Sequence, residues 1–229
     1  LPARRGLVPA VAGQPLWLHA ASVGEINSAA ELLAEIRARW PDRPLVLTAF
    51  TPTGVARWQS LCPEATVTAL PIDHPRWVAR AIQRWRPRTL LIVETEIWPN
   101  LLLCAHAARV PVLFVSARIQ ERSARGWRRW LGEALLQDML QPVKLIGAQT
   151  QADAERFRGL GAGRVEVHGS LKWDAKPRFE AARVAMIKAA LGDRPCWLAA
   201  STHPGEEEIM LAVHKALLGR WPDLCLILA

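Results

Sequence analysis

Short apolar runs alternate with amphipathic stretches along most of this chain. The runs are rich in Leu, Val and Ile and only a few residues long, which is typical of strands buried on both faces. Turn residues separate them from the stretches that follow. The pattern predicts strands at residues 16–20, 45–48, 66–70, 89–93, 112–115, 144–148 and 165–167.

The intervening stretches have helical periodicity. Ala30, Leu33 and Ala34, for example, recur at the i, i+3 and i+4 spacing of one helix face. Because strands and helices alternate with short loops, we expect an α/β fold with a doubly wound, mainly parallel sheet and helices on both faces. The predicted helices span residues 26–40, 54–61, 76–85, 99–108, 123–140 and 152–160.

The alternation breaks near residues 169–177 and then resumes. We therefore predict an N-terminal α/β domain at 1–170, a linker at 171–177 and the beginning of a second α/β domain at 178–229. In the second domain the pattern predicts helix 178–191, strand 196–200, helix 205–218 and strand 224–228. The sequence starts at Leu1 and stops within an apolar run that indicates a buried strand, so we expect it to be truncated at both ends.

Composition narrows the class of protein. Apolar residues make up 51% of the chain and charged residues 22%, a globular rather than a disordered profile. The sequence shows no signal peptide and no run of about 18 apolar residues that would span a bilayer. The formal net charge of +8 favours an anionic partner, although a generally arginine-rich proteome explains it equally well.

The cysteines do not indicate a metal site or a disulfide framework. They are widely spaced, without a C-x-x-C pair or a neighbouring histidine cluster. We expect buried free thiols in a reducing compartment at Cys62, Cys104, Cys196 and Cys225.

Polar residues follow the first predicted strand, where parallel sheets gather their ligands. Gly24 allows close approach of the backbone, and the start of the next helix favours an anion. Glu25 there suits a general base, but the spacing of Ser22 and Glu25 is also that of a capping box. The two roles are not exclusive.

Two further segments carry candidate chemistry. Glu94 and Glu96 follow an apolar strand and would face the same side in extended backbone, either as a carboxylate pair or as a helix-start acid beside a solvated side chain. Lys172 lies at the domain break, where a lysine in a cleft neutralises developing charge, although a surface lysine in a linker is commoner.

A polar turn and a basic helix complete the candidates. Residues 51–54, with Thr53 and Gly54, form either a ligand loop or a helix cap. Residues 118–129 are rich in arginine, with Trp127 and Trp130 close by. Such a helix either rests on phosphate headgroups or has a solvated face with its tryptophans packed inward.

Together these motifs resemble the 3-deoxy-D-manno-octulosonic acid (Kdo) transferases of lipopolysaccharide synthesis. They occur in the order of the family and cover essentially the whole chain. The matching segments are His19–Glu25, Thr51–Gly54, Glu94–Asn100, Ser116–Arg118, Gly169–Asp174 and Ala200–Glu207.

The resemblance implies a two-domain glycosyltransferase of the GT-B type. Its N-terminal domain would bind the lipid A precursor (lipid IVA) and its C-terminal domain the donor CMP-Kdo. Transfer would proceed with inversion, without metal or cofactor, at the cytoplasmic face of the bacterial inner membrane. The protein would be peripheral there or anchored by a segment absent here, on an anionic membrane surface.

The resemblance also assigns residues. Glu25 aligns with the general base, and Glu94 and Lys172 align with positions that stabilise the transition state. We expect Ser201 and His203 to face the donor cleft. The other expected substrate contacts are Ser22, Gly24, Thr53, Gly54, Glu96, Asn100 and Arg118.

Departures from the family affect the expected activity. Its usual N-terminal membrane anchor and its later donor-binding loops are absent, so we expect the chain as given to be an incomplete fragment with little or no activity. A sugar-nucleotide epimerase of the same fold is one alternative, and a basic protein that binds membrane or nucleic acid is another. Nucleic acid is disfavoured because the arginines are spread over several helices and no recognised motif appears.

Overall fold

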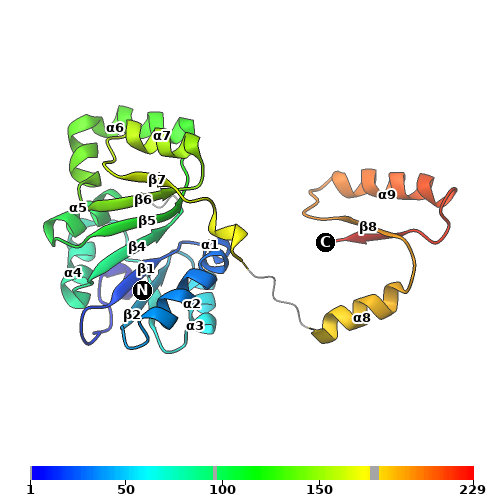
Figure 1. Cartoon of the computed structure of the whole chain (residues 1–229), viewed down its shortest axis with the longest axis horizontal. Coiled ribbons are helices and arrows are strands. Elements are labelled where there is room, and N and C mark those ends of the chain that lie inside the picture. The colour runs from blue at the N-terminus through cyan, green and yellow to red at the C-terminus, as the bar shows by residue number, and fades with distance from the viewer. Residues whose placement is uncertain (1, 95–96, 176–180) are drawn as a thin grey trace. The chain divides into compact units, whose positions relative to one another are not determined.

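The computed structural model describes residues 2–94, 97–175 and 181–229 and divides the chain into two compact units. The first comprises Leu1–Lys176 and the second Pro177–Ala229 (Figure 1). Residues 171–175, expected in the linker, lie in the first unit.

A seven-stranded parallel sheet forms the centre of the first unit, in the order β3-β2-β1-β4-β5-β6-β7 (Figure 1). The apolar runs predicted all of its strands, and the doubly wound α/β class is confirmed. The strand order reverses between β1 and β4, which is where open sheets of this kind bind ligands. The strands are β1 Leu16–His19, β2 Leu45–Ala49, β3 Thr66–Ala69, β4 Thr89–Val93, β5 Val112–Ala117, β6 Val143–Ala148 and β7 Val165–Val167.

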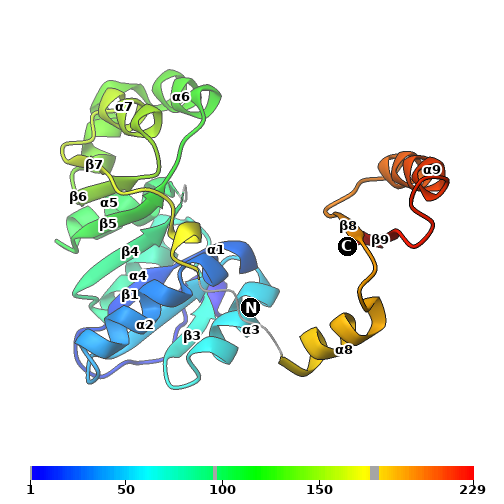
Figure 2. The ribbon, with the colours of Figure 1, turned by 45° about the vertical axis from the view of Figure 1, so that its right-hand side comes forward.

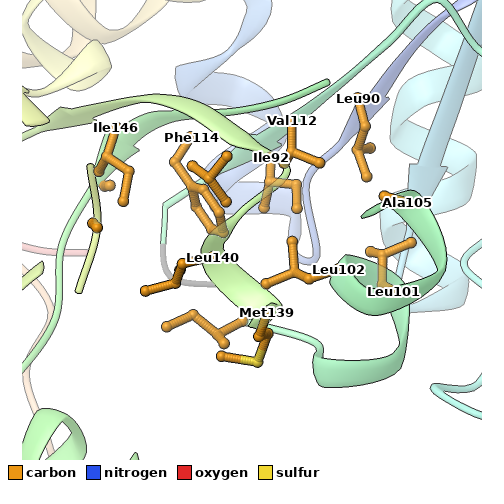
Figure 3. Close-up of a cluster of buried hydrophobic side chains, with 14 of the residues drawn as sticks. Leu90, Ile92, Leu101, Leu102, Ala105, Val112, Phe114, Met139, Leu140 and Ile146 are labelled. Carbon is orange, nitrogen blue, oxygen red and sulfur yellow. The ribbon is translucent and has the colours of Figure 1, made fainter. Parts of the chain in front are cut away.

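Helices cover both faces of this sheet and bury two hydrophobic clusters. The helices α1, α2 and α3 lie together on one side of the sheet (Figure 2). One cluster lies between these helices and the strands β1 and β2. The other lies under α4, α5, α6 and α7, where Ile92 and Phe114 of the sheet pack with Leu102 and Leu140 (Figure 3). The helices are α1 Val23–Ser28, α2 Ala30–Arg39, α3 Pro52–Leu61, α4 Pro75–Trp85, α5 Pro99–Ala107, α6 Glu121–Leu140 and α7 Gln151–Gly159, with the 3-10 helices η1 Pro2–Arg5 and η2 Leu171–Trp173.

Two predicted helices differ from the structure in their continuity. Residues 26–40 form α1 and α2 rather than one helix, and the Ser28 hydroxyl donates to the Gly24 carbonyl at 3.0 Å next to the break. Such back-bonding by serine bends helices. In α6, Gly132 interrupts the helix with φ 70° and ψ 166°, a conformation that glycine adopts without steric cost.

Buried tryptophans support the carboxyl ends of β1 and β2. The indole N–H of Trp17 donates to Thr48 Oγ1 at 2.8 Å, and that of Trp58 donates to the Thr48 carbonyl at 3.1 Å. Trp17 also packs edge-on against Trp85, with ring centroids 4.9 Å apart. Because an unpaired buried N–H is costly, Thr48 lets these large side chains fill the core on both faces without that penalty.

The expectation of buried cysteines is wrong for most of them. All four thiols are free, but only Cys62 is buried, whereas Cys104 and Cys225 are partly buried and Cys196 is exposed. Cys196 lies in a two-stranded sheet that has too few neighbours in the described chain to bury it. The pKa of the Cys62 thiol is raised to about 11, mainly by burial and secondly by its hydrogen bond to Glu64.

Cys62 should therefore resist alkylation at about pH 8, where Cys196 reacts, because the thiolate is the nucleophile. Its folded pKa lies above the unfolded value, so its contribution to stability is present below that value and is lost as pH rises toward about 11. Iodoacetamide labelling mapped by mass spectrometry at about pH 8 and again near pH 10.5 would measure both thiols. Equal labelling of Cys62 and Cys196 at the lower pH would contradict the prediction.

The second unit contains a parallel pair of strands, β8 Cys196–Ala199 and β9 Cys225–Leu228, with helices α8 Ala181–Leu191 and α9 Glu206–Leu218. The residue pattern predicted these elements, apart from the start of the first helix at residues 178–180, which lies outside the described residues. Several of their large apolar side chains are exposed. They include Met186, Ile187, Leu198, Ile209, Leu211 and Val213.

Candidate active site at the carboxyl ends of the strands

The candidate residues of the first unit follow the carboxyl ends of its strands. β1 and β4 are neighbours in parallel register, with His19 opposite Ile92. Glu25 lies in the first turn of α1, the helix that follows β1, and Glu94 directly follows β4. Arg118 follows β5, and Lys172 lies in η2 after β7. The strand order reverses between β1 and β4, so each of the two segments that leave this point carries an acidic residue, Glu25 after β1 and Glu94 after β4.

Glu25 is held at the start of α1 by its own helix cap. Its carboxylate accepts hydrogen bonds from the Ala21 N–H at 2.7 Å and from the Ser22 hydroxyl at 2.9 Å, and Ser22 Oγ accepts from the Glu25 N–H. The predicted capping role of Ser22 and Glu25 is therefore confirmed, although the backbone donor is Ala21 rather than Ser22. The carboxylate is only partly buried, and Gly24 beside it is exposed. This arrangement orients the Glu25 carboxylate without enclosing it.

Glu94 is a buried carboxylate that contacts two cationic side chains. Its Oε2 lies 3.1 Å from Arg118 Nε, and its Oε1 lies 3.4 Å from Lys172 Nζ. The Glu94 side chain is 9% exposed, whereas those of Arg118 and Lys172 are 59% and 57% exposed. The pairing offsets the cost of burying the Glu94 charge, and both cationic side chains remain more than half exposed.

The backbone at Glu94 is unusual. Its φ of 57° lies in the left-handed region, which costs a non-glycine residue roughly 1–3 kcal/mol and is common at functional sites. Its N–H still donates to the Val115 carbonyl at 3.0 Å, so the sheet hydrogen bonding to β5 continues.

Ser116 attaches the segment that carries Lys172 to the sheet. Its hydroxyl accepts from the Leu171 N–H at 3.2 Å and from Gln149 Nε2 at 3.1 Å. Gln149 also donates to the Ser116 carbonyl at 2.9 Å, and Ser116 itself has a φ of 56°. The sequence marked Ser116 only as part of a motif and gave no sign of Gln149, since their role depends on contacts between distant segments.

The turn after β2 is compact. Thr51 caps α3 by accepting from the Gly54 N–H at 3.0 Å, and Thr53 is exposed with its hydroxyl 3.2 Å from that of Thr51. Gly54 is buried, and a Cβ added there would lie 2.8 Å from the Ala49 Cβ. Close packing thus accounts for glycine at this position.

Asn100 has a structural partner that the sequence did not indicate. Its side-chain Nδ2 donates to the Asp73 carbonyl at 2.9 Å, and the Asp73 carboxylate accepts from the N–H groups of Asn100 and Leu101 at 3.0 and 2.8 Å. Asp73 therefore caps α5 from a distant loop. Glu96, the predicted partner of Glu94, lies outside the described residues.

Ser201 and His203 lie in the second unit, after β8 and before α9. The Ser201 N–H donates to the Ala229 carbonyl at 2.8 Å, and the His203 N–H donates to Glu206 at 2.9 Å. Both residues thus occupy the carboxyl end of β8, the edge at which a parallel sheet binds ligands.

The arginine-rich helix α6 presents its tryptophans differently. Trp127 packs against the core, whereas Trp130 is 85% exposed. Arg125 pairs with Glu121 at 2.9 Å, and Arg128 Nε donates to the Gly159 carbonyl at 3.0 Å. Within the described ranges, no helix has the length and apolar character needed to cross a membrane.

A polar pocket of about 650 Å³ adjoins the Glu94 cluster. It lies at the carboxyl ends of β5 and β6, near the starts of α6 and α7, and its wall includes Arg118, Gln149, Asp153 and Arg156. Arg118 thus belongs both to this pocket and to the cluster around Glu94. The pocket has the size and polarity to take part of a charged substrate.

Comparison with known proteins gives a consistent family. Residues 1–175 match the model of the 3-deoxy-D-manno-octulosonic-acid transferases. The chain is 35% identical over 220 residues to the 3-deoxy-D-manno-octulosonic acid transferase of Haemophilus influenzae, covering 94% of this chain and 51% of that protein. The Bordetella pertussis transferase is 36% identical, with coverage of 91% and 49%. The chain therefore spans about half the length of the curated relatives that it matches.

Solved structures support the fold. The UDP-GlcNAc 2-epimerase of Neisseria meningitidis bound to UDP-GlcNAc aligns with a TM-score of 0.64 at 16% identity, over 94% of this chain and 65% of that one. At this identity the likeness concerns the fold alone.

Proposed function

The chain belongs to the 3-deoxy-D-manno-octulosonic-acid (Kdo) transferase family, and from this we propose that the protein moves Kdo from CMP-Kdo to lipid IVA with inversion. The observation that carries the proposal is the cluster of Glu94, Arg118 and Lys172 at the carboxyl edge of the sheet on which Glu25 also lies. That edge combines an oriented, accessible carboxylate with exposed cations, which suits an alcohol acceptor and a phosphate leaving group.

In this proposal Glu25 is the general base. The acceptor hydroxyl oxygen forms a bond to the anomeric carbon of Kdo while the bond from that carbon to the CMP phosphate oxygen breaks. The hydroxyl proton passes to the Glu25 carboxylate, and the bonding pair leaves with CMP. A single displacement of this kind inverts the anomeric centre. The hydrogen bonds from Ala21 and Ser22 keep the carboxylate oriented for that transfer.

Lys172 and Arg118 supply positive charge for the departing CMP. Charge that develops on the phosphate in the transition state is stabilised by a cation already in place, which needs no reorganisation during the reaction. The Glu94 carboxylate pairs with both cations, at 3.1 Å from Arg118 Nε and 3.4 Å from Lys172 Nζ. Its proposed role is thus to orient them around the reacting centre.

The proposed location is the cytoplasmic face of the bacterial inner membrane. The net charge of +8 and the exposed Trp130 on a basic helix support contact with an anionic surface. On that surface lipid IVA would be presented to the first unit, while Ser201 and His203 of the second unit would contact the donor.

A transfer assay on the full-length gene product tests the proposal. Purified protein is incubated with lipid IVA and CMP-Kdo, and in parallel with UDP-GlcNAc as an alternative donor. We expect a Kdo-bearing lipid from CMP-Kdo and no reaction of UDP-GlcNAc. Epimerisation of UDP-GlcNAc without Kdo transfer would reject the proposal in favour of an epimerase.

Replacing Ser116 with alanine should lower kcat for transfer by about tenfold, since misplacement of a catalytic group is costly even when the group remains. The change removes the acceptor of the Leu171 N–H and frees the segment that carries Lys172. Steady-state kinetics would show the fall in kcat with little change in the acceptor KM, and hydrogen exchange would show a faster Leu171 amide.

Ser60→Ala is the matched control, because Ser60 is exposed on α3 and lies outside the cluster around Glu94 and the neighbouring polar pocket. If Leu171 exchanges faster in Ser116→Ala while kcat stays unchanged, the anchor does not position Lys172 for catalysis.

A further inference from the structure

A second pocket opens at the other end of the sheet, at the amino ends of the strands. It is an open pocket with a volume of about 780 Å³, formed by the ends of α4 and α5, the start of β4 and the segment before β1. Its polar lining residues are Gln14, Gln83, Arg86, Arg88, Thr89 and Arg109.

The pocket is basic, and its charge is not neutralised by the protein. Three arginines line it, and no described lining residue is acidic. In the part of the chain that the structure describes, the side chains of Arg86, Arg88 and Arg109 form no hydrogen bond and no ion pair. Arg118 and Arg156, by contrast, pair with carboxylates near the carboxyl edge. The free guanidinium groups are available to a ligand.

Two of these arginines occupy backbone positions that favour glycine. Arg86 follows α4 with φ 49°, and Arg109 follows α5 with φ 57°, in the left-handed conformation that commonly ends helices. Favourable interaction with the helix dipole explains a cation near each helix end. It does not explain Arg88, which lies just before β4. The backbone N–H of Arg88 donates to the Pro15 carbonyl, but its guanidinium group takes no part in that bond.

We propose that this pocket binds a phosphate-bearing anion and is separate from the transferase site. A guanidinium group can donate two parallel hydrogen bonds to the oxygens of one phosphate group. Neutral donors beside the arginines are supplied by Gln14, Gln83 and Thr89. The volume lies within the range of small-molecule sites, which suits a ligand with more than one phosphate group. The same chemistry is offered by a soluble polyphosphate and by a phospholipid headgroup.

Calorimetric titration of the full-length protein with pyrophosphate at constant ionic strength tests the site. All variants carry the Lys172→Ala substitution as a common background, because this substitution weakens any binding of pyrophosphate at the proposed transferase site. In that background Arg88→Gln should weaken pyrophosphate binding by about tenfold or more, as expected for a lost charge-assisted hydrogen bond. Arg86→Gly with Arg109→Gly should do the same, and glycine suits both backbone positions, so the fold is retained.

Arg84→Gln is the matched control, because Arg84 is exposed in the last turn of α4 and does not line the pocket. Its pyrophosphate affinity should equal that of the background. Vesicles of phosphatidylcholine with and without phosphatidic acid distinguish the two sources. Arg88-dependent binding of pyrophosphate supports a soluble ligand, and Arg88-dependent binding of phosphatidic acid vesicles alone supports a headgroup.

The proposal is overturned if neither probe binds, if the pocket variants bind as tightly as Arg84→Gln, or if chloride at equal ionic strength displaces pyrophosphate completely. None of these outcomes depends on Kdo transfer, because the readout is binding. Failure of the transferase proposal would therefore leave this test intact.

Discussion

Replacing Glu25 with glutamine should lower the rate of Kdo transfer by ~10²-fold or more, the contribution expected of a general base. Glutamine keeps the size of the side chain and one acceptor oxygen, which can still accept from the Ala21 N–H, while its amide NH2 group can donate to the Ser22 hydroxyl oxygen. Unlike the carboxylate, however, the glutamine side chain cannot take up the proton of the substrate hydroxyl. Steady-state transfer by the full-length protein, with thermal unfolding followed in parallel, separates the chemical effect from loss of the helix start.

Glu35→Gln provides the control for Glu25→Gln. Glu35 is exposed on α2, and its neutralisation removes one negative charge from the same part of the first unit. Its rate should match that of the wild type. If Glu25→Gln folds and keeps near-normal activity, Glu25 is a helix cap alone, and another carboxylate such as Glu94 or Glu96 must take the proton.

Replacing Lys172 with alanine should lower kcat by about 10²–10³-fold, the typical loss for one preorganised group that stabilises transition-state charge. Lys172 Nζ lies 3.4 Å from Glu94, and its side chain is more than half exposed, so its removal affects the charge at the site more than packing. Single-turnover measurements with saturating CMP-Kdo would isolate the chemical step from donor binding.

Lys144→Ala is the comparison, because Lys144 is exposed on β6. Lys172→Arg should recover part of the rate, since it retains the positive charge. A Lys172→Ala protein with unchanged kcat and a raised KM for CMP-Kdo would show that the lysine contributes only to donor binding.

The sequence predicted the centre of the sheet well because β1, β2 and β4 are almost completely buried and form nearly continuous apolar runs. Helix continuity was harder to predict. Ser28 and Gly132 are tolerated within helical patterns, and only the observed hydrogen bond and dihedral angles show that they interrupt them. The cysteines were predicted to be buried from residue type alone, which does not reveal that Cys196 lies in an exposed strand.

The candidate site was only partly visible in the sequence. Since parallel strands end at one edge, Glu25 and Glu94 were expected on the same side of the sheet. The pairing of Glu94 with Arg118 and Lys172 depends on tertiary contacts. The left-handed backbone at Glu94 and Ser116 has no local signal, because neither residue is glycine. The same is true of Asp73, whose partner Asn100 is distant in sequence.

The hydrogen bond from the Leu171 N–H to Ser116 also fixes the segment that carries Lys172, the proposed catalytic lysine, to the first unit. Lys172 follows directly and contacts Glu94, whereas the second unit begins at Pro177. Lys172 is therefore held by two neighbouring strands of the sheet, by β5 through Ser116 and by the end of β4 through Glu94. A change in the packing of β4 against β5 would therefore displace this ammonium group, although Lys172 lies far along the chain from both strands.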